Sequence, residues 1–212
     1  MLAAVSVALA VSGCTAEQSD SASTGATVSD RPSSTSPEGE CGTNAPDGSA
    51  LLSTASIDAP PGAPVGRSAN VVALDPATCH GAVSGTIPAG SCAPADFPWT
   101  VSAGTQSEEL YSRGARTVAR ATFEVSGRPS LRETVIRAAA GSNLVPAFAA
   151  HVATCRGTVL ATRNGDPTLV ALGGSPGLLL DLEDDRVVAL SALDARTPAQ
   201  LTTLMSRAVE AG

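Results

Sequence analysis

The chain has 212 residues, which favours a single domain, and its 20 acidic residues outnumber its 13 basic residues, giving a formal charge of −7. An acidic chain repels the phosphates of nucleic acid, so this balance argues against a nucleic-acid-binding protein. Hydrophobic residues make up 43% of the sequence but aromatic residues only 2%, so the core must be built mainly from Ala, Val and Leu.

Residues 1–13 form an apolar run that is too short to span a membrane, which takes about 20 residues. Such a run is typical of the hydrophobic region of a signal peptide. It ends in Val11-Ser12-Gly13-Cys14, which resembles the lipobox of bacterial lipoproteins, where the cysteine thiol receives a lipid. We therefore expect a lipoprotein signal peptide over 1–13, a lipidated Cys14, and export to the outer face of the cell membrane. The alternative is ordinary secretory cleavage, with Cys14 left as a free or disulfide-bonded thiol.

Residues 14–49 are rich in Ser, Thr, Gly, Pro and acidic residues and contain almost no large apolar side chain. A segment of this composition cannot bury enough surface to offset the entropy lost on ordering. We expect it to be a disordered tether that carries one globular domain, residues 50–212, away from the membrane surface.

Seven prolines lie between residues 50 and 99 and leave room only for short elements there, such as a helical turn at Leu51-Leu52 and a strand over 71–74. Residues 115–125 then show the period of two that is typical of a strand with one wet face. Its apolar positions are Ala119, Ala121, Phe123 and Val125, and its polar positions are Arg116, Arg120, Thr122 and Glu124.

Ser130 and Glu133 have the spacing of a capping box, which predicts a helix over 130–140 that ends at Gly141. A second helix is predicted over 143–155, where apolar residues recur at helical spacing. A third is predicted from Thr197, with Pro198 in its first turn and Gln200 completing a capping box.

Two hairpins are predicted between the second and third helices. Asn164-Gly165 joins strands over 158–163 and 168–172, and an acidic turn joins strands over 178–182 and 187–190. Together these elements predict an α+β domain with an antiparallel sheet of about five strands and helices packed on one face.

The four cysteines other than Cys14 are an even number in an exported chain, which predicts two disulfides. Three pairings are possible. We favour Cys79 with Cys155, which leaves Cys41 with Cys92, because longer loops gain more from closure. His80 and His151 lie near two of these cysteines, but the sequence lacks the paired Cys-x-x-Cys of a convincing zinc site, and we expect no metal.

Three patterns in the sequence resemble catalytic or metal sites. Residues 173–177 match the Gly-x-Ser-x-Gly nucleophile elbow, but Pro176 has no N–H for an oxyanion hole and no His follows His151. The acidic residues around 181–185 lack the spacing of a calcium loop, and Glu108-Glu109 has no partner at a defined spacing. We therefore expect no catalytic residues and no cofactor.

The order of features, with Pro76-Ala77-Thr78-Cys79, a helix ending at Cys155, a strand meander and a closing helix, resembles small actinobacterial lipoproteins. Their globular part is similar to the extracellular sensor domain of mycobacterial PknH-type receptor kinases. The resemblance covers about residues 70–210 and implies a cleft between sheet and helices that binds a small molecule, a wall component or an envelope protein. The alternatives are a structural or adaptor lipoprotein without a ligand pocket and, third, an envelope hydrolase.

Overall fold

The structure, a computed structural model, describes residues 41–45, 51–79, 92, 97, 107–173 and 177–211. All of these lie within one compact unit, residues 36–212. No helix among the described residues combines the length and hydropathy needed to cross a membrane.

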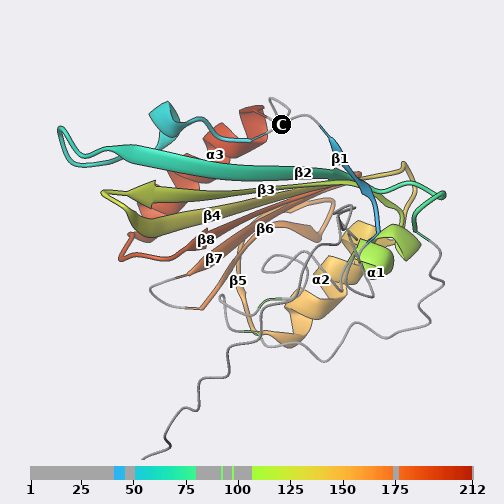
Figure 1. The fold of residues 1–212 in the computed structure, drawn as a ribbon. Helices are drawn as coiled ribbons and strands as arrows, with labels where there is room; N and C mark the ends of the chain where they lie inside the picture. Colours follow the sequence, from blue (N-terminus) through green and yellow to red (C-terminus); the bar gives the residue numbers. More distant parts are fainter. Residues whose placement is uncertain are drawn as a thin grey trace, which may run out of the picture. The chain divides into compact units, whose positions relative to one another are not determined.

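The described residues form a single antiparallel sheet with the strand order β1-β2-β3-β4-β8-β7-β6-β5 (Figure 1). The α+β class is confirmed, but the sheet has eight strands where about five were expected. The strands are β1 Thr43–Ala45, β2 Val65–Ala73, β3 Ala115–Val125, β4 Arg128–Ala138, β5 Thr158–Arg163, β6 Asp166–Leu172, β7 Leu178–Glu183 and β8 Arg186–Ala192.

Two of the sheet's hairpins end in tight turns whose backbone suits the twist of the strands. Asn164 and Gly165, between β5 and β6, have φ values of 55° and 93°, and Ser126 and Gly127, between β3 and β4, have 52° and 74°. Positive φ at both central residues is what a type I′ turn requires. The hairpin predicted at Asn164-Gly165 is confirmed, as is the β7–β8 pairing across the acidic turn.

The helix predicted over 130–140 is wrong, because this segment is strand β4. β4 pairs with β3 on one side and β8 on the other, so its backbone hydrogen bonds are made within the sheet. Thr134, Val135 and Ile136 form a β-branched run, which favours a strand over a helix. The capping-box side chains bind elsewhere: Ser130 donates to Asp194 at 2.6 Å, and Glu133 accepts from the Leu52 N–H at 2.9 Å.

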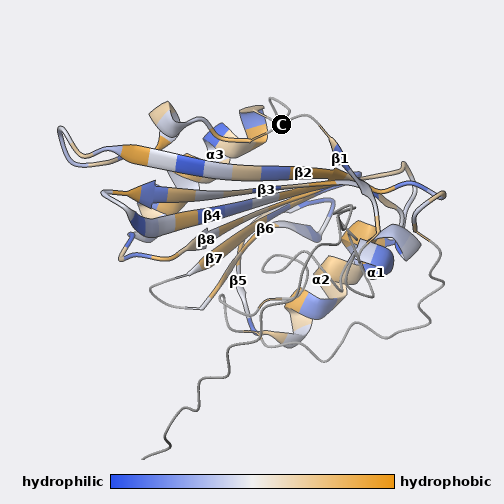
Figure 2. Ribbon diagram, in the orientation of Figure 1, coloured by the Kyte–Doolittle hydropathy of each residue, from blue (hydrophilic) through white to orange (hydrophobic). Residues whose placement is uncertain are grey.

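Helices cover both faces of the sheet, which corrects the expectation of helices on one face. Helices α1 (Ser107–Ser112) and α2 (Leu144–Thr154) lie on one side, and α3 (Pro198–Ala211) lies on the other (Figure 1). Strand β8 is consequently buried at all seven positions. Figure 2 shows the same difference in hydropathy, since β7 and β8 are mostly hydrophobic whereas β2 to β4 alternate.

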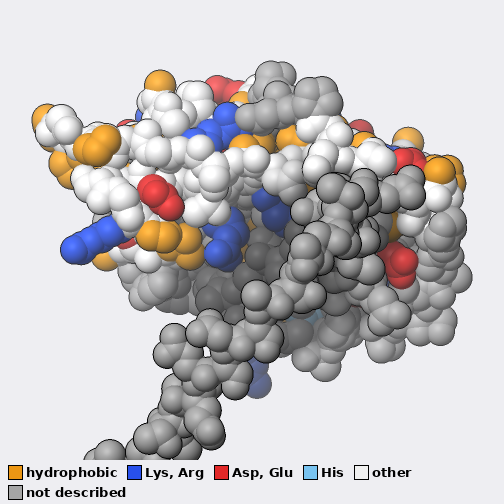
Figure 3. All heavy atoms as spheres, in the orientation of Figure 1, with side chains coloured by type: hydrophobic (Ala, Val, Ile, Leu, Met, Phe, Trp, Pro, Cys, Tyr) orange, Lys and Arg blue, Asp and Glu red, His pale blue; other side chains and the backbone are white. Residues whose placement is uncertain are grey.

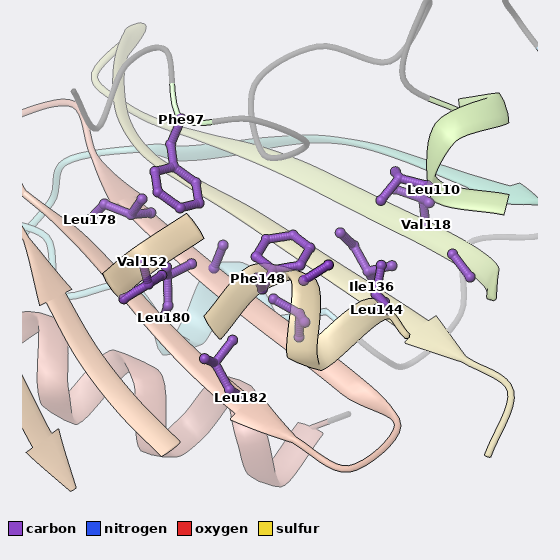
Figure 4. Packing of buried hydrophobic residues seen from close by; sticks show 14 of the residues in the cluster. Phe97, Leu110, Val118, Ile136, Leu144, Phe148, Val152, Leu178, Leu180 and Leu182 are labelled. Atoms are coloured by element: carbon purple, nitrogen blue, oxygen red, sulfur yellow. The ribbon is translucent and has the colours of Figure 1, made fainter. Parts of the chain in front are cut away.

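The α1/α2 face is centred on Phe148 of α2, which points at the sheet (Figure 4). Phe97 lies beside it, with ring centroids 6.4 Å apart, and both side chains are fully buried. Leu144 and Val152 extend this stripe along α2, as the predicted helix over 143–155 requires, and they pack on alternate residues of the strands beneath.

The α3 face has its own core, formed by α3, the strands and the segment around the short helix η1 (Thr54–Ser56). Leu204 and Met205 of α3 pack near Leu52, which precedes η1. Arg207 of α3 donates to the carbonyl of Ser56 at 2.6 Å. This hydrogen bond joins the predicted closing helix to the proline-rich segment that the sequence reads mostly as loop.

The four cysteines form two disulfides, as expected, but the favoured pairing is wrong: Cys41 bonds Cys79, and Cys92 bonds Cys155. β1 pairs with the end of β2, with Thr43 opposite Ala73, so Cys41 lies just beyond the sheet. The turn that follows β2 brings Cys79 back toward it, with the Cys79 N–H donating to the carbonyl of Asp75 at 2.9 Å. Strand β1 and Cys41 thus lie inside the segment 14–49 that was predicted as tether.

Candidate functional site

A cleft of about 320 Å³ lies between the first turns of α3 and the end of the sheet formed by β5, β6 and β7. Its described lining is mostly apolar, with two polar side chains from α3 and the turn before it. A volume of this size with few polar groups is typical of small-molecule sites. The lining residues are Leu160, Ala171, Leu172, Gly173, Gly177, Leu178, Leu179, Arg196, Pro198, Leu201 and Thr202.

The start of α3, which forms one wall of the cleft, is fixed by a capping box at Thr197 and Gln200. This confirms the capping box predicted from the sequence. The Thr197 N–H donates to Oε1 of Gln200 at 2.8 Å, and the Gln200 N–H donates to Oγ1 of Thr197 at 3.3 Å. These two bonds satisfy backbone groups that a helix start leaves without intrahelical partners. They hold Pro198 and Leu201 in place along the cleft.

Arg196 is the charged residue of the described lining, and it is buried, with 8% of its surface exposed. Its Nε lies 2.9 Å from Oδ1 of Asp194, and its Nη2 donates to Oγ of Ser130, which in turn donates to Asp194. The side chain is therefore held by a carboxylate and a hydroxyl from two different segments. This arrangement places a fixed donor group beside an apolar wall, which suits a ligand with an apolar body and an acceptor oxygen.

Glu133 is a second buried charged group on the α3 face, and it lies outside the cleft. It is completely buried, and burial raises the pKa of its carboxyl to about 7, although the Leu52 N–H and the charge of Arg67 act in the opposite direction. A carboxyl that titrates near neutrality in a pocket is a candidate acid or base. Here its bond to Leu52 ties the segment before η1 to β4, which is a structural role.

Three of the four disulfide cysteines, Cys41, Cys79 and Cys155, lie on the α1/α2 face of the sheet. Cys14 and His80 lie outside the described residues. His151 lies on α2 beside the second disulfide, with Nε2 3.8 Å from Sγ of Cys155 and its ring 5.1 Å from that of Phe97. Burial lowers the pKa of His151. Within the described residues, no group of three or more His, Cys, Asp or Glu side chains is placed to hold a metal ion.

The acidic and serine patterns of the sequence do not meet at the cleft. Glu183 forms an ion pair with Arg186 at 2.5 Å, and Glu109 forms one with Arg113 at 3.1 Å. Burial, together with the charge of Glu183, raises the pKa of Asp181. Ser175 lies outside the described residues, but the strands on either side of it, β6 and β7, pair antiparallel, so the segment joins strand to strand and not strand to helix.

The residues that build the cleft were not found by sequence reasoning, apart from the helix start at Thr197. No short sequence motif marks Arg196 as a site residue, because its partner Ser130 lies 66 residues away in the chain. Comparison of the chain with family models, with curated proteins and with solved structures finds no match.

Proposed function

We propose that the protein is a cell-envelope lipoprotein whose folded domain binds a small amphipathic molecule in the cleft between α3 and strands β5 to β7. The observation that carries this proposal is the apolar cleft with the fixed guanidinium of Arg196 in its wall. The resemblance to actinobacterial lipoproteins with a sensor-like domain supports it, because that resemblance implies a ligand held between sheet and helices.

The described wall of the cleft indicates the chemistry of the ligand. Leucine side chains from β5, β7 and α3 favour an apolar body. Because Asp194 already offsets the charge of Arg196, the ligand needs to supply no full negative charge. A carbonyl or hydroxyl oxygen is sufficient to accept from Arg196.

The proposal is for binding and not for catalysis. The polar side chains of the described lining are a guanidinium, which offers donors and no acceptor, and the hydroxyl of Thr202. General acid-base chemistry needs a group that exchanges a proton near the working pH. The candidate hydrolase motif around Ser175 is accordingly interpreted as a connection between strands.

Two adjacent threonines on α3 provide a matched test of the cleft. Thr202 lines the cleft and Thr203 does not, while both are exposed and both donate to the carbonyl four residues earlier. We expect the neutral probe Nile red to bind the purified domain, and Thr202→Trp to weaken binding about tenfold by filling the cleft, while Thr203→Trp leaves it unchanged. Equal binding by all three proteins, or none by the wild type, would contradict the proposal.

The lipid anchor has a separate test. Cys14→Ala removes the thiol that would carry the lipid, so the variant should leave the membrane fraction for the soluble fraction on cell fractionation. A stable anchor takes more than one acyl chain, so partial lipidation should give partial release. If the variant still sediments with membranes after a salt wash, Cys14 is not the anchor.

The adaptor alternative is favoured by a different observation, the outer edge of the sheet. β5 is an edge strand, all six of its residues are exposed, and Val159 and Leu160 are 47% and 48% exposed. An edge with exposed apolar side chains can accept a strand from a partner protein. Val159→Lys should abolish partner capture in this case and leave Nile red binding unchanged, which separates the two functions.

A further inference from the structure

The apolar wall of the cleft at α3 continues to the outer edge of the sheet. Three neighbouring strands contribute to the lining, with Leu179 of β7, Ala171 of β6 and Leu160 of β5. Leu179 and Ala171 are cross-strand partners, and both pack in the core of the α3 face. Because β5 is the last strand of the described sheet and Leu160 is 48% exposed, the cleft crosses β7 and β6 and opens at the edge.

The strand pairing of β5 places Val159 and Leu160 on opposite faces of the sheet. Val159 is paired with Val170 of β6, which belongs to the α1/α2 core, whereas Leu160 lines the cleft at α3. The next pair joins Ala161 to Leu169, so Leu160 is an extra residue between two pairs, as in a β-bulge. Such a bulge in an edge strand opposes the addition of another strand. The exposed side chain of Leu160 therefore suits a small ligand in the cleft better than a strand from a partner.

The cleft is polar at the end away from β5. Arg196 donates to Ser130 of β4, which lies on the far side of β8 and β7 from β5 in the sheet order. The guanidinium already meets a carboxylate, with Nε 2.9 Å from Oδ1 of Asp194. A ligand carboxylate would compete with Asp194 for the same group, whereas an ester oxygen needs only a donor. The two ends of the cleft thus suit a molecule with a neutral polar group and a long apolar tail.

The opposite face of the sheet does not offer this combination over strands β2 to β4. Figure 3 shows that face, where arginine side chains, in blue, gather over these strands. Arg120 and Arg132 line a surface groove there. An apolar chain laid over them would take charged groups out of water without pairing them, which is costly. An apolar tail is therefore better accommodated on the α3 side.

We propose that the cleft binds the acyl chain of a neutral ester lipid, with the ester oxygen at Arg196 and the chain crossing β7 and β6 to leave the cleft past Leu160. This inference rests on the proposed ligand-binding function and names the class of its ligand. An acyl chain gains from burial in proportion to its length, so each buried methylene group should tighten binding about fourfold.

The test is displacement of Nile red by 1-monoacylglycerols with hexanoyl, octanoyl and decanoyl chains, each kept below its critical micelle concentration. The protein is the mature chain with Cys14→Ala, which carries no lipid on that thiol and needs no detergent. We expect the inhibition constant, measured by Nile red fluorescence, to fall about fourfold for each added methylene group. Octanoate has a full charge in place of the ester and should bind about tenfold more weakly than monooctanoylglycerol.

Leu160→Thr and Val159→Thr are the matched variants for the path of the chain. Both replace an apolar side chain of almost equal exposure on β5 with a residue that favours strands. Leu160→Thr should weaken binding of the decanoyl ester about fivefold and that of the hexanoyl ester less, because only the longer chain reaches the edge. Val159→Thr should leave both unchanged.

Failure of this inference is distinct from failure of the proposed function. If Nile red does not bind the protein at all, the ligand-binding function itself is wrong. If Nile red binds but the esters do not displace it, or their inhibition constants do not change with chain length, the cleft binds a different class of apolar ligand. Equal losses in Leu160→Thr and Val159→Thr would overturn the path past Leu160. Octanoate binding as tightly as its ester would overturn the neutral polar end.

Discussion

The two faces of the sheet use buried charge in opposite ways. On the α3 face each of two buried arginines pairs with a nearby carboxylate and also reaches a distant segment. Arg196 pairs with Asp194 and donates to Ser130 of β4. Arg186 pairs with Glu183 and donates to the carbonyl of Val209 in α3 at 3.1 Å. On the other face, Arg120 and Arg132 lie diagonally on neighbouring strands, and burial together with the charge of Arg132 lowers the pKa of Arg120. Oppositely charged pairs therefore join parts of the α3 face, whereas like charges lie side by side on the other face.

The faces also differ in what holds them together. Cys41 and Cys79 belong to the α1/α2 core, and Cys155 packs against it, so both disulfides serve that face. The α3 face is held by apolar packing and by the ion pairs and hydrogen bonds of α3 with η1 and the strands. Changes to covalent links and changes to polar contacts should therefore affect the two faces differently.

The largest effect is expected from the disulfides. They span 38 and 63 residues, and replacing either pair with alanine should lower the free energy of unfolding by about 4 kcal/mol, because the unfolded chain regains the entropy of a closed loop of that length. Urea unfolding of Cys41→Ala/Cys79→Ala and Cys92→Ala/Cys155→Ala measures this. Non-reducing peptide mapping of the wild type checks the pairing, and a Cys79–Cys155 peptide would show that the pairing described here is wrong.

The next effect concerns pH and the α3 face. The pKa of Glu133 is raised from its ordinary 4.5 to about 7, so its protonated form favours folding. The contribution of protonated Glu133 to the free energy of unfolding is complete below pH 4.5 and is lost as pH rises through 7. The total loss of stability is about 3 kcal/mol.

Urea unfolding at a series of pH values from 5 to 8 is the measurement for this loss. Glu133→Gln keeps an acceptor for the Leu52 N–H and should remove the loss of stability over this range. Glu124→Gln, at an exposed position, should keep it. The same pH dependence in all three proteins would exclude Glu133 as its source.

A smaller loss is expected at Ser130, whose hydroxyl lies between Arg196 and Asp194. Ser130→Ala should lower the free energy of unfolding by about 2 kcal/mol, because it leaves buried charged groups with one partner fewer. The exposed Ser206 of α3 is the control, and Ser206→Ala should change stability by less than about 0.5 kcal/mol. Chemical denaturation measures the free energy of unfolding of both variants. Similar losses of stability in the two would mean that the hydrogen bonds of Ser130 contribute little.

Two capping-box patterns show how far the sequence alone predicts this fold. The pattern at Thr197 precedes an apolar stripe at helical spacing, Leu201, Leu204 and Met205, and local and long-range preferences agree on α3. The pattern at Ser130 precedes residues that alternate between the two faces, and pairing with β3 and β8 determines the outcome. Local signals were sufficient for α2, α3 and the β5–β6 and β7–β8 hairpins, but not for α1 or for β4.

Long-range contacts account for what the sequence did not predict. The pairing of Cys41 with Cys79 depends on where β1 joins the sheet. The cleft depends on Arg196, which lies in the turn before α3 and donates to Ser130 of a strand that is distant in the sequence. Alternation correctly placed Arg120 on the opposite face of its strand from Ala119 and Ala121, but that face is covered by α1 and α2 and is not fully wet. The position of Arg132 on the neighbouring strand was not predicted, because its segment was expected to be a helix.

The smallest expected effect is at Thr197, and it concerns the α3 face alone. Its hydroxyl accepts from the Gln200 N–H at the start of α3, and Thr197→Ala should cost about 1 kcal/mol of stability. Because Pro198 and Leu201 line the cleft, loosening the first turn of α3 should also weaken Nile red binding. Urea unfolding measures the loss of stability, and Nile red fluorescence measures binding. Unchanged Nile red binding in a variant that has lost stability would mean that the first turn of α3 does not shape the cleft.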